Sequence, residues 1–172
     1  MEFNDLLISG GVSGAITDPF SDEAIAHAEL YYEEIRKSKT DIVKISENTG
    51  IERSSILLVK NYLFNDEHEL MNGFHRFDPD FYIAESWRRL AFDKEHIQEH
   101  DIVLLKHELN EIKLVAQGFS QKEAHDITNN SGLNYQQMCD EYYHILEQKQ
   151  THKDINAGAV VHRKRDDWDL ER

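Results

Sequence analysis

Apolar residues recur at intervals of three and four positions along most of the chain, with polar residues between them. This spacing is typical of amphipathic helices that bury one face. One clear example is the stretch that places Ile25, Ala28 and Tyr32 on a single face. The predicted helices are 22–37, 40–47, 54–64, 79–90, 99–117, 121–129 and 135–148. We therefore expect an all-α fold, a compact bundle of six to seven helices.

Residues that favour helix ends stand at several of the predicted boundaries. Ser21 and Asp78 precede helices and can accept hydrogen bonds from free backbone N–H groups. Ser120 and Glu123 have the spacing of a capping box. Gly118 follows the longest predicted helix, where glycine often ends a helix. These signals support the boundaries that the apolar pattern predicts.

The segment 65–77 is polar and lacks a helical period, so it is expected to be a loop. No strand and no internal repeat are predicted in the chain. In the helix that follows the loop, Trp87 is expected to face the core. Arg88 and Arg89 are expected to face water.

The length of 172 residues is typical of one domain. Residues 1–20 contain three glycines and a proline without a sustained period, and we expect them to be a flexible lead-in. Residues 21–148 form the helical domain. Residues 149–172 are charged, include a basic patch at 162–165, and are expected to be a mobile tail.

Composition limits the classes of protein that this chain can belong to. The net charge of -14 repels phosphate backbones and makes broad nucleic-acid binding an unfavourable expectation. No apolar run approaches the roughly 18 to 20 residues that span a bilayer. The single cysteine excludes an internal disulfide, and the first residues lack the features of a secretory signal. We expect a cytoplasmic or virion-associated protein.

The two short helices 40–47 and 54–64, separated by a glycine turn, fit a helix-turn-helix unit. A DNA-binding version would use Arg53 and Lys60 of the second helix. A structural helical hairpin has the same pattern, and two basic residues are few for DNA recognition. We therefore favour the structural interpretation.

The ten histidines are the feature of the composition that most requires a functional account. His107 and Glu111 are four residues apart within a predicted helix, so they lie on one face and could bind the same metal ion. The pattern partly matches the zinc helix H-E-x-x-H, with Glu111 in place of the second histidine and Glu108 as the general base. His68 and His125 are the candidates for further ligands. The alternative is a solvated charged face with a partly buried His107.

Several segments, taken together, resemble one known domain. They are residues 8–36, the helical pair ending in Asn61–Phe64, and residues 76–90, 97–111 and 119–127. The domain lies at the carboxy-terminal end of phage head-morphogenesis (minor head) proteins and also occurs as a module of bacterial polymorphic toxins. The resemblance covers residues 8–147 and does not extend to the large portal-associated region of the phage proteins.

The resemblance implies functional residues of its own. In that family a histidine follows the segment that Asn61–Phe64 matches, and an H-E-x-x-E element precedes an A-H pair. The matching residues here are His68, His107, Glu108, Glu111 and His125. The resemblance therefore implies the same His/Glu centre as the spacing does, but it implies no particular reaction.

Three functions stay open at this point. The first is a phage-derived interaction domain that binds a capsid, portal or immunity protein through its acidic helical surface. The second is a toxin-type metal-dependent hydrolase, a nuclease or peptidase, that binds a divalent metal such as zinc through the His/Glu centre. The third is the helix-turn-helix DNA binder.

Overall fold

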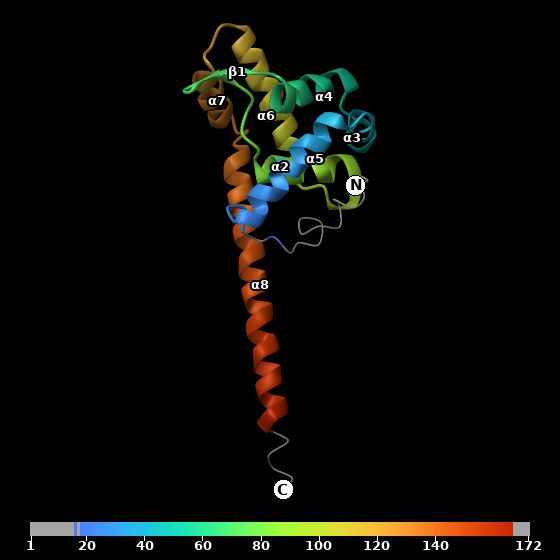
Figure 1. Ribbon diagram of the computed structural model, residues 1–172, viewed down its shortest axis with the longest axis vertical. Helices are drawn as coiled ribbons and strands as arrows, with labels where there is room; N and C mark the ends of the chain where they lie inside the picture. The colour runs from blue at the N-terminus through green and yellow to red at the C-terminus, as the bar shows by residue number, and fades with distance from the viewer. Residues whose placement is uncertain (1–15, 17, 167–172) are drawn as a thin grey trace.

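The computed structural model describes residue 16 and residues 18–166, and it confirms the all-α fold (Figure 1). The described part of the chain contains seven α-helices, two short helical turns and one hairpin. The α-helices are α2 (Asp22–Lys37), α3 (Asp41–Thr49), α4 (Arg53–Lys60), α5 (Phe81–Phe92), α6 (Glu99–Ala116), α7 (Gln121–Asn130) and α8 (Tyr135–Asp166). The π-helical turn η1 (Asn61–Asn65) continues α4, and the 3₁₀ turn η2 (Lys94–His96) follows α5.

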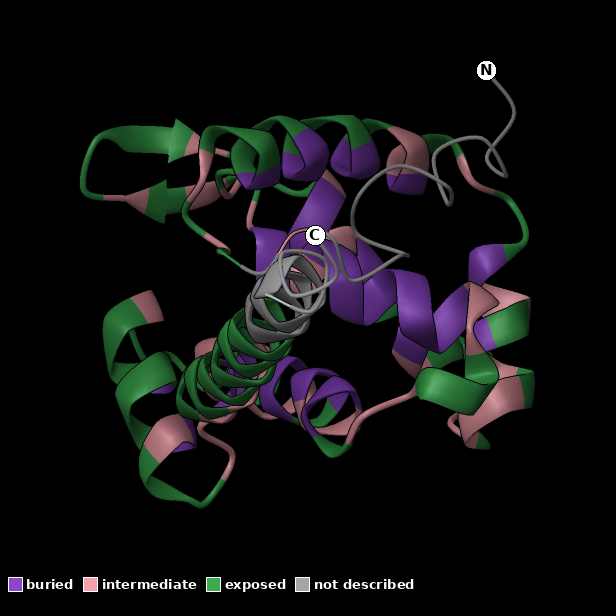
Figure 2. Ribbon diagram, turned by 90° about the horizontal axis from the view of Figure 1, so that it is seen from below, coloured by how far each residue is buried: buried purple, intermediate pink, exposed green. Residues whose placement is uncertain are grey.

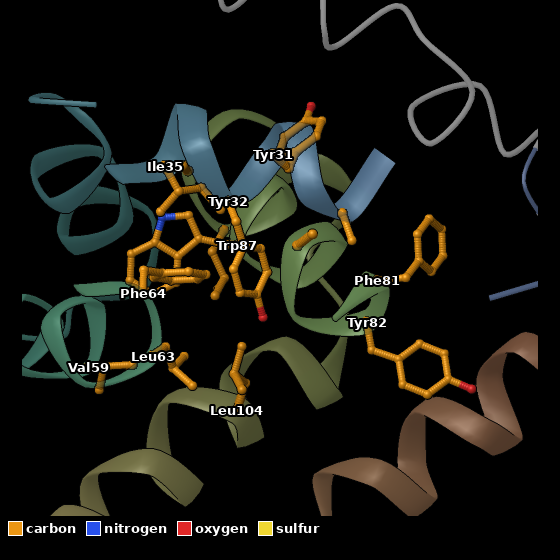
Figure 3. Packing of buried hydrophobic residues seen from close by; sticks show 14 of the residues in the cluster. Tyr31, Tyr32, Ile35, Val59, Leu63, Phe64, Phe81, Tyr82, Trp87 and Leu104 are labelled. Carbon is orange, nitrogen blue, oxygen red and sulfur yellow. The ribbon is translucent and has the colours of Figure 1, made fainter. Parts of the chain in front are cut away.

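Helix α5 is the central element of the core. Ten of its twelve residues are buried, and α2, α3 and α6 pack against it. Figure 2 shows buried residues gathered in the middle of the body, while residues 147–156 of α8 are exposed. At the centre, the ring of Phe64 packs edge-on against Tyr32 and Trp87, with ring centroids 4.8 and 5.1 Å apart (Figure 3). Such edge-to-face packing stabilises the core beyond simple burial.

Two of the three N-terminal helix caps that the sequence predicts are confirmed. The Ser21 hydroxyl accepts a hydrogen bond from the backbone N–H of Ala24, and Ser120 forms a capping box with Glu123. The expected cap at Asp78 is wrong, because Asp80 caps α5 by accepting from the N–H of Ile83. The helix consequently begins two residues later than the proline signal predicts.

The expectation that Arg88 and Arg89 face water is wrong. Both are only 4% exposed and form ion pairs inside the protein. Arg89 makes a two-pronged contact with Asp101, with Nε–Oδ2 and Nη2–Oδ1 distances of 2.8 Å, and Arg88 pairs with Glu85 and Asp93. The contact between Arg89 and Asp101 joins α5 to the first turn of α6.

The segment 65–77 was expected to be a loop, and no strand was predicted in the chain. The structure corrects both expectations in part. The segment contains a hairpin of β1 (His68–Leu70) and β2 (Gly73–His75), which pair antiparallel with Leu70 opposite Gly73. Gly73 has a φ of 107°, which a residue with a side chain rarely adopts, so glycine allows this reversal. The strands are three residues long, too short to produce a recognisable alternation in the sequence.

The last helix was expected to end near Gln148. Instead, α8 continues to Asp166. Its second half extends away from the body as a single projecting helix, downward in Figure 1. Residues 149–156 contain no proline or glycine, and side-chain hydrogen bonds such as Gln150 to Asp154 link successive turns. Most of the predicted lead-in and residues 167–172 lie outside the described residues, as do the side chains of the basic patch at 162–165.

The helical pair α3 and α4 does not present the basic surface that a DNA binder would need. Lys60 is 4% exposed, and its Nζ lies 2.9 Å from a carboxylate oxygen of Asp41. It also donates to the Ser38 carbonyl, at 2.8 Å. Of the two basic residues considered for DNA contact, only Arg53 is exposed. Among residues 18–166, no helix combines the length and apolar character needed to cross a lipid bilayer.

Candidate metal centre

Helices α6 and α7 pack together and bring three potential metal ligands to one place. α6 carries His107 and Glu111 one turn apart, and α7 carries His125. Gly118, with a φ of 101°, lies in the short turn between the two helices. The capping box at Ser120 then starts α7 so that its first turns lie beside the second half of α6 (Figure 1). The local sequence between Gly118 and Ser120 therefore determines where His125 lies.

The three ligand atoms are arranged around one carboxylate oxygen. Oε2 of Glu111 lies 3.1 Å from Nε2 of His107 and 3.2 Å from Nδ1 of His125, and all three atoms lie within 4.8 Å of one another. In a tetrahedral zinc site with bonds of roughly 2.0 to 2.1 Å, ligand atoms are about 3.3 Å apart. The distances from Oε2 of Glu111 to His107 and to His125 are already close to that value. The donor set of two imidazoles and a carboxylate therefore fits a zinc ion.

The orientation of His107 is fixed by the turn that precedes α8. Nδ1 of its ring lies 2.7 Å from the carbonyl oxygen of Leu133, which can only accept a hydrogen bond. Nδ1 therefore carries the hydrogen, and Nε2 faces Glu111. Metal-binding histidines usually have such a partner on the other ring nitrogen. If the His107 ring is neutral, its Nε2 carries no hydrogen and faces the Oε2 oxygen of Glu111. Both atoms then offer electron pairs and neither can donate a hydrogen bond, so a proton or a cation must lie between them.

The second oxygen of Glu111 is held by two donors. The hydroxyl of Tyr62 donates to Oε1 at 2.8 Å, and the side-chain amide of Gln121 donates to the same oxygen. Burial alone would raise the pKa of Glu111, but hydrogen bonds from His107, His125 and Tyr62 outweigh it and lower the pKa to about 2. Glu111 is therefore a carboxylate across the physiological pH range, as a metal ligand has to be.

His125 is the most exposed member of the cluster, since half of its side chain is accessible to solvent. Its hydrogen bond with Glu111 raises its pKa. Its other ring nitrogen, Nε2, lies 3.0 Å from the amide nitrogen of Asn129, whose buried oxygen has no partner in the described structure. Exchanging the two ends of this amide would let the oxygen accept from Nε2–H and leave Nδ1 free to coordinate.

Glu108 lies beside the cluster without a partner. It is 7% exposed, lines the same pocket as the three ligands, and forms no hydrogen bond or ion pair within the described residues. Burial, and then the negative charge of Glu111, raise its pKa well above the ordinary value. A nearby cation would oppose both effects. A buried carboxyl group with no partner in the protein suits a residue that acts on something bound in the pocket.

His68 does not join the cluster, although it was one of the four expected ligands. Its Nε2 lies 2.7 Å from the backbone oxygen of Tyr62, and its ring stacks on Phe77 with centroids 4.1 Å apart. It is absent from the group of ligand atoms that lie together. His68 instead packs against Tyr62, the residue that donates to Glu111. It therefore supports the cluster from one layer further out.

The cluster lies in the wall of a pocket of about 640 Å³, a size that suits a small ligand or a few residues of a chain. The pocket is bounded by the hairpin, by the start of α5, by α6 and α7, and by the start of α8. It is lined by Leu63, Glu69, Leu70, Met71, Phe77, Asp78, Asp80, Ile83, His107, Glu108, Glu111, Ser120, Gln121, Lys122, His125, Tyr135 and Gln136.

Two residues of the centre were missed in the sequence. Tyr62 is 49 residues from Glu111, and no local spacing connects them. Gln121 offered a usable signal, because it stands four residues before His125 and therefore shares a face of the same short helix. Only the wide π-helical turn at the end of α4, in which Tyr62 lies, shows how its hydroxyl reaches α6.

Comparison of the sequence with models of protein families and with characterised proteins, and of the fold with solved structures, found no match. The resemblance to the domain of phage minor head proteins therefore stays a prediction, and the site has to be interpreted from its own geometry.

Proposed function

We propose that this protein is a metal-dependent hydrolase whose metal ligands are His107, Glu111 and His125. The observation that carries the proposal is the arrangement of their three ligand atoms within 4.8 Å of one another in the wall of a pocket. Zinc suits this donor set best, because two histidines and one glutamate hold the catalytic zinc of thermolysin and carboxypeptidase A. Three protein ligands leave a coordination position for water or substrate.

Glu108 is the residue that we assign to proton transfer. It directly follows a ligand, is buried in the same pocket and has no partner in the described structure. A divalent cation held by these three residues would polarise water and the bond to be broken. The Glu108 carboxylate accepts a proton from the attacking water and passes it to the leaving group. The carboxylate thus completes the proposed hydrolytic site.

The resemblance seen in the sequence supports the same residues, since its H-E-x-x-E and A-H elements are the ones that the fold brings together. We propose on this basis that the protein is a hydrolase of the toxin type. A phage or immunity protein as partner stays a prediction, because no contact within the described residues bears on it. The DNA-binding alternative is not supported, since Lys60 is buried against Asp41.

The test is the metal content of the purified protein, together with a zinc titration after chelation. We expect about one zinc ion per chain, and at a zinc concentration of 100 Kd a stabilisation of roughly 2.7 kcal/mol. His125→Ala should abolish both effects with little damage to the fold, because His125 is half exposed. His152→Ala, an exposed histidine on α8, is the matched control and should bind zinc normally.

Turnover is then followed on three probe classes: a peptide mixture, DNA and RNA oligonucleotides, and a p-nitrophenyl ester. The zinc-loaded protein should hydrolyse at least one of them, and Glu108→Gln should keep its zinc while losing about 100-fold or more in rate. A protein that binds no zinc, or that binds zinc and hydrolyses none of the probes, would refute the proposal.

A further inference from the structure

We propose that the substrate is a polypeptide that binds in extended form along the outer edge of β1 and places an apolar side chain in the pocket. This inference rests on the proposed hydrolase function and specifies its substrate class. Three observations carry it: a free strand edge at the pocket, the charge of the pocket lining, and its apolar wall.

The first observation is the strand edge. β1 pairs only with β2 in the described structure, in the register His68–His75, Glu69–Phe74 and Leu70–Gly73. The pair Leu70–Gly73 closes a two-residue turn and is hydrogen-bonded, and antiparallel pairs alternate between bonded and non-bonded. The backbone N–H and C=O of Glu69 therefore point away from β2. Because Glu69 lines the pocket, these two groups offer pairing to an extended chain beside the cluster.

The second observation is the charge of the lining. Five carboxyl side chains line the pocket, and Lys122 is the only lysine or arginine among the lining residues. A phosphodiester backbone would bring negative charge against these carboxyl groups, and even a bound divalent cation would not make the surroundings positive. A peptide carries no backbone charge, and basic side chains on it would be attracted. The lining therefore favours a polypeptide over a nucleic acid.

The third observation is the apolar part of the wall. Leu63, Leu70, Met71, Phe77 and Ile83 line the pocket on the side of the hairpin and α5. Met71 at the hairpin tip is fully exposed, although large apolar side chains usually find cover. An extended chain on β1 would place alternate side chains toward this wall. The site therefore favours substrates with an apolar residue near the scissile bond and basic residues around it.

The reaction is ordinary hydrolysis of an amide. The oxygen of water adds to the carbonyl carbon, and the bond between this carbon and the peptide nitrogen breaks. One proton of the water passes to the Glu108 carboxylate and from there to the leaving nitrogen. The products are a carboxylic acid and an amine. The acid's remaining proton moves to the amine, giving a carboxylate and an ammonium ion, and no electron is gained or lost.

Two proline variants test the strand edge. Glu69→Pro removes the outward N–H beside the pocket and leaves the β1–β2 hydrogen bonds in place. Phe74→Pro does the same on the outer edge of β2, at an exposed residue that does not line the pocket, and is the matched control. Glu69→Gln separates the effect of the lost carboxylate from that of the lost N–H.

The zinc-loaded variants are compared by kcat/KM on peptides from a proteome digest, with cleavage sites read by mass spectrometry and with DNA and RNA oligonucleotides as the second probe. We expect cleavage of peptides only, next to apolar residues. Loss of one backbone hydrogen bond should lower kcat/KM about tenfold in Glu69→Pro, with less than about twofold change in Phe74→Pro.

The outcomes separate this inference from the proposed function. Cleavage of oligonucleotides or the ester without cleavage of peptides would overturn the inference while leaving a metal-dependent hydrolase. Equal kcat/KM for the two proline variants would overturn binding along β1. Failure to bind zinc would instead refute the proposed function itself.

Discussion

Removal of the Tyr62 hydroxyl tests whether Glu111 is oriented by residues outside the metal ligands. In Tyr62→Phe the ring stays in place, but Oε1 of Glu111 loses its 2.8 Å hydrogen bond. Loss of such an outer partner usually lowers metal affinity about 10- to 100-fold. Gln121 still donates to the same oxygen, so we expect the lower end, about tenfold or about 1.4 kcal/mol.

The assay is a competition titration against a chromophoric zinc chelator at pH 7. Tyr142→Phe is the control, because Tyr142 packs against His100 and does not line the pocket. Combining Tyr62→Phe with Gln121→Ala removes both donors, and zinc affinity should then fall toward the 100-fold limit. If Tyr62→Phe binds zinc as tightly as the wild type, the hydroxyl does not orient Glu111 in the loaded site.

Two further predictions concern the buried charges of the core. Asp101→Asn removes the two-pronged anionic partner of buried Arg89 and leaves only Glu85, whose Oε2 lies 3.9 Å from Nη1. This change should lower the free energy of unfolding by about 3 to 5 kcal/mol in urea, whereas Asp126→Asn at an exposed ion pair should leave the midpoint nearly unchanged. For Glu85, burial would raise the pKa, but His27 and Arg88 outweigh it and lower the pKa. A carboxyl group with a lowered pKa stabilises the fold above its ordinary pKa, and the stabilisation is lost as the pH falls through the folded value. The thermal midpoint of the wild type should therefore fall more steeply in acid than that of Glu85→Gln, and parallel acid profiles would contradict this account.

The helices and the closeness of His107 and Glu111 could be predicted because both depend on local spacing. Apolar residues every three to four positions report which face is buried, and the four-residue step from His107 to Glu111 guarantees a shared face. The position of His125 needed one more step, the packing of α7 on α6. Sequence reasoning could name His125 but could not place it.

The parts that could not be predicted depend on contacts between distant residues. Arg88 and Arg89 looked solvated because charged residues are rarely buried, and only the acidic partners Glu85 and Asp101 reverse that expectation. His68 looked like a ligand because it is a histidine near the right elements, but the hairpin directs its ring to Phe77. Neither the burial of the two arginines nor the orientation of the His68 ring can be recognised from the spacing of residues in the sequence.

The second half of α8 is a suitable attachment site for a label, because it projects from the body. From Glu147 to Asp166 the helix advances about 28 Å at 1.5 Å per residue, and residues 147–156 are exposed. The pocket uses only the first two residues of α8, Tyr135 and Gln136. A fluorophore or surface tether attached near Asp166 would therefore stand well clear of His107, Glu111 and His125, so the proposed zinc binding and turnover could be measured on single immobilised molecules.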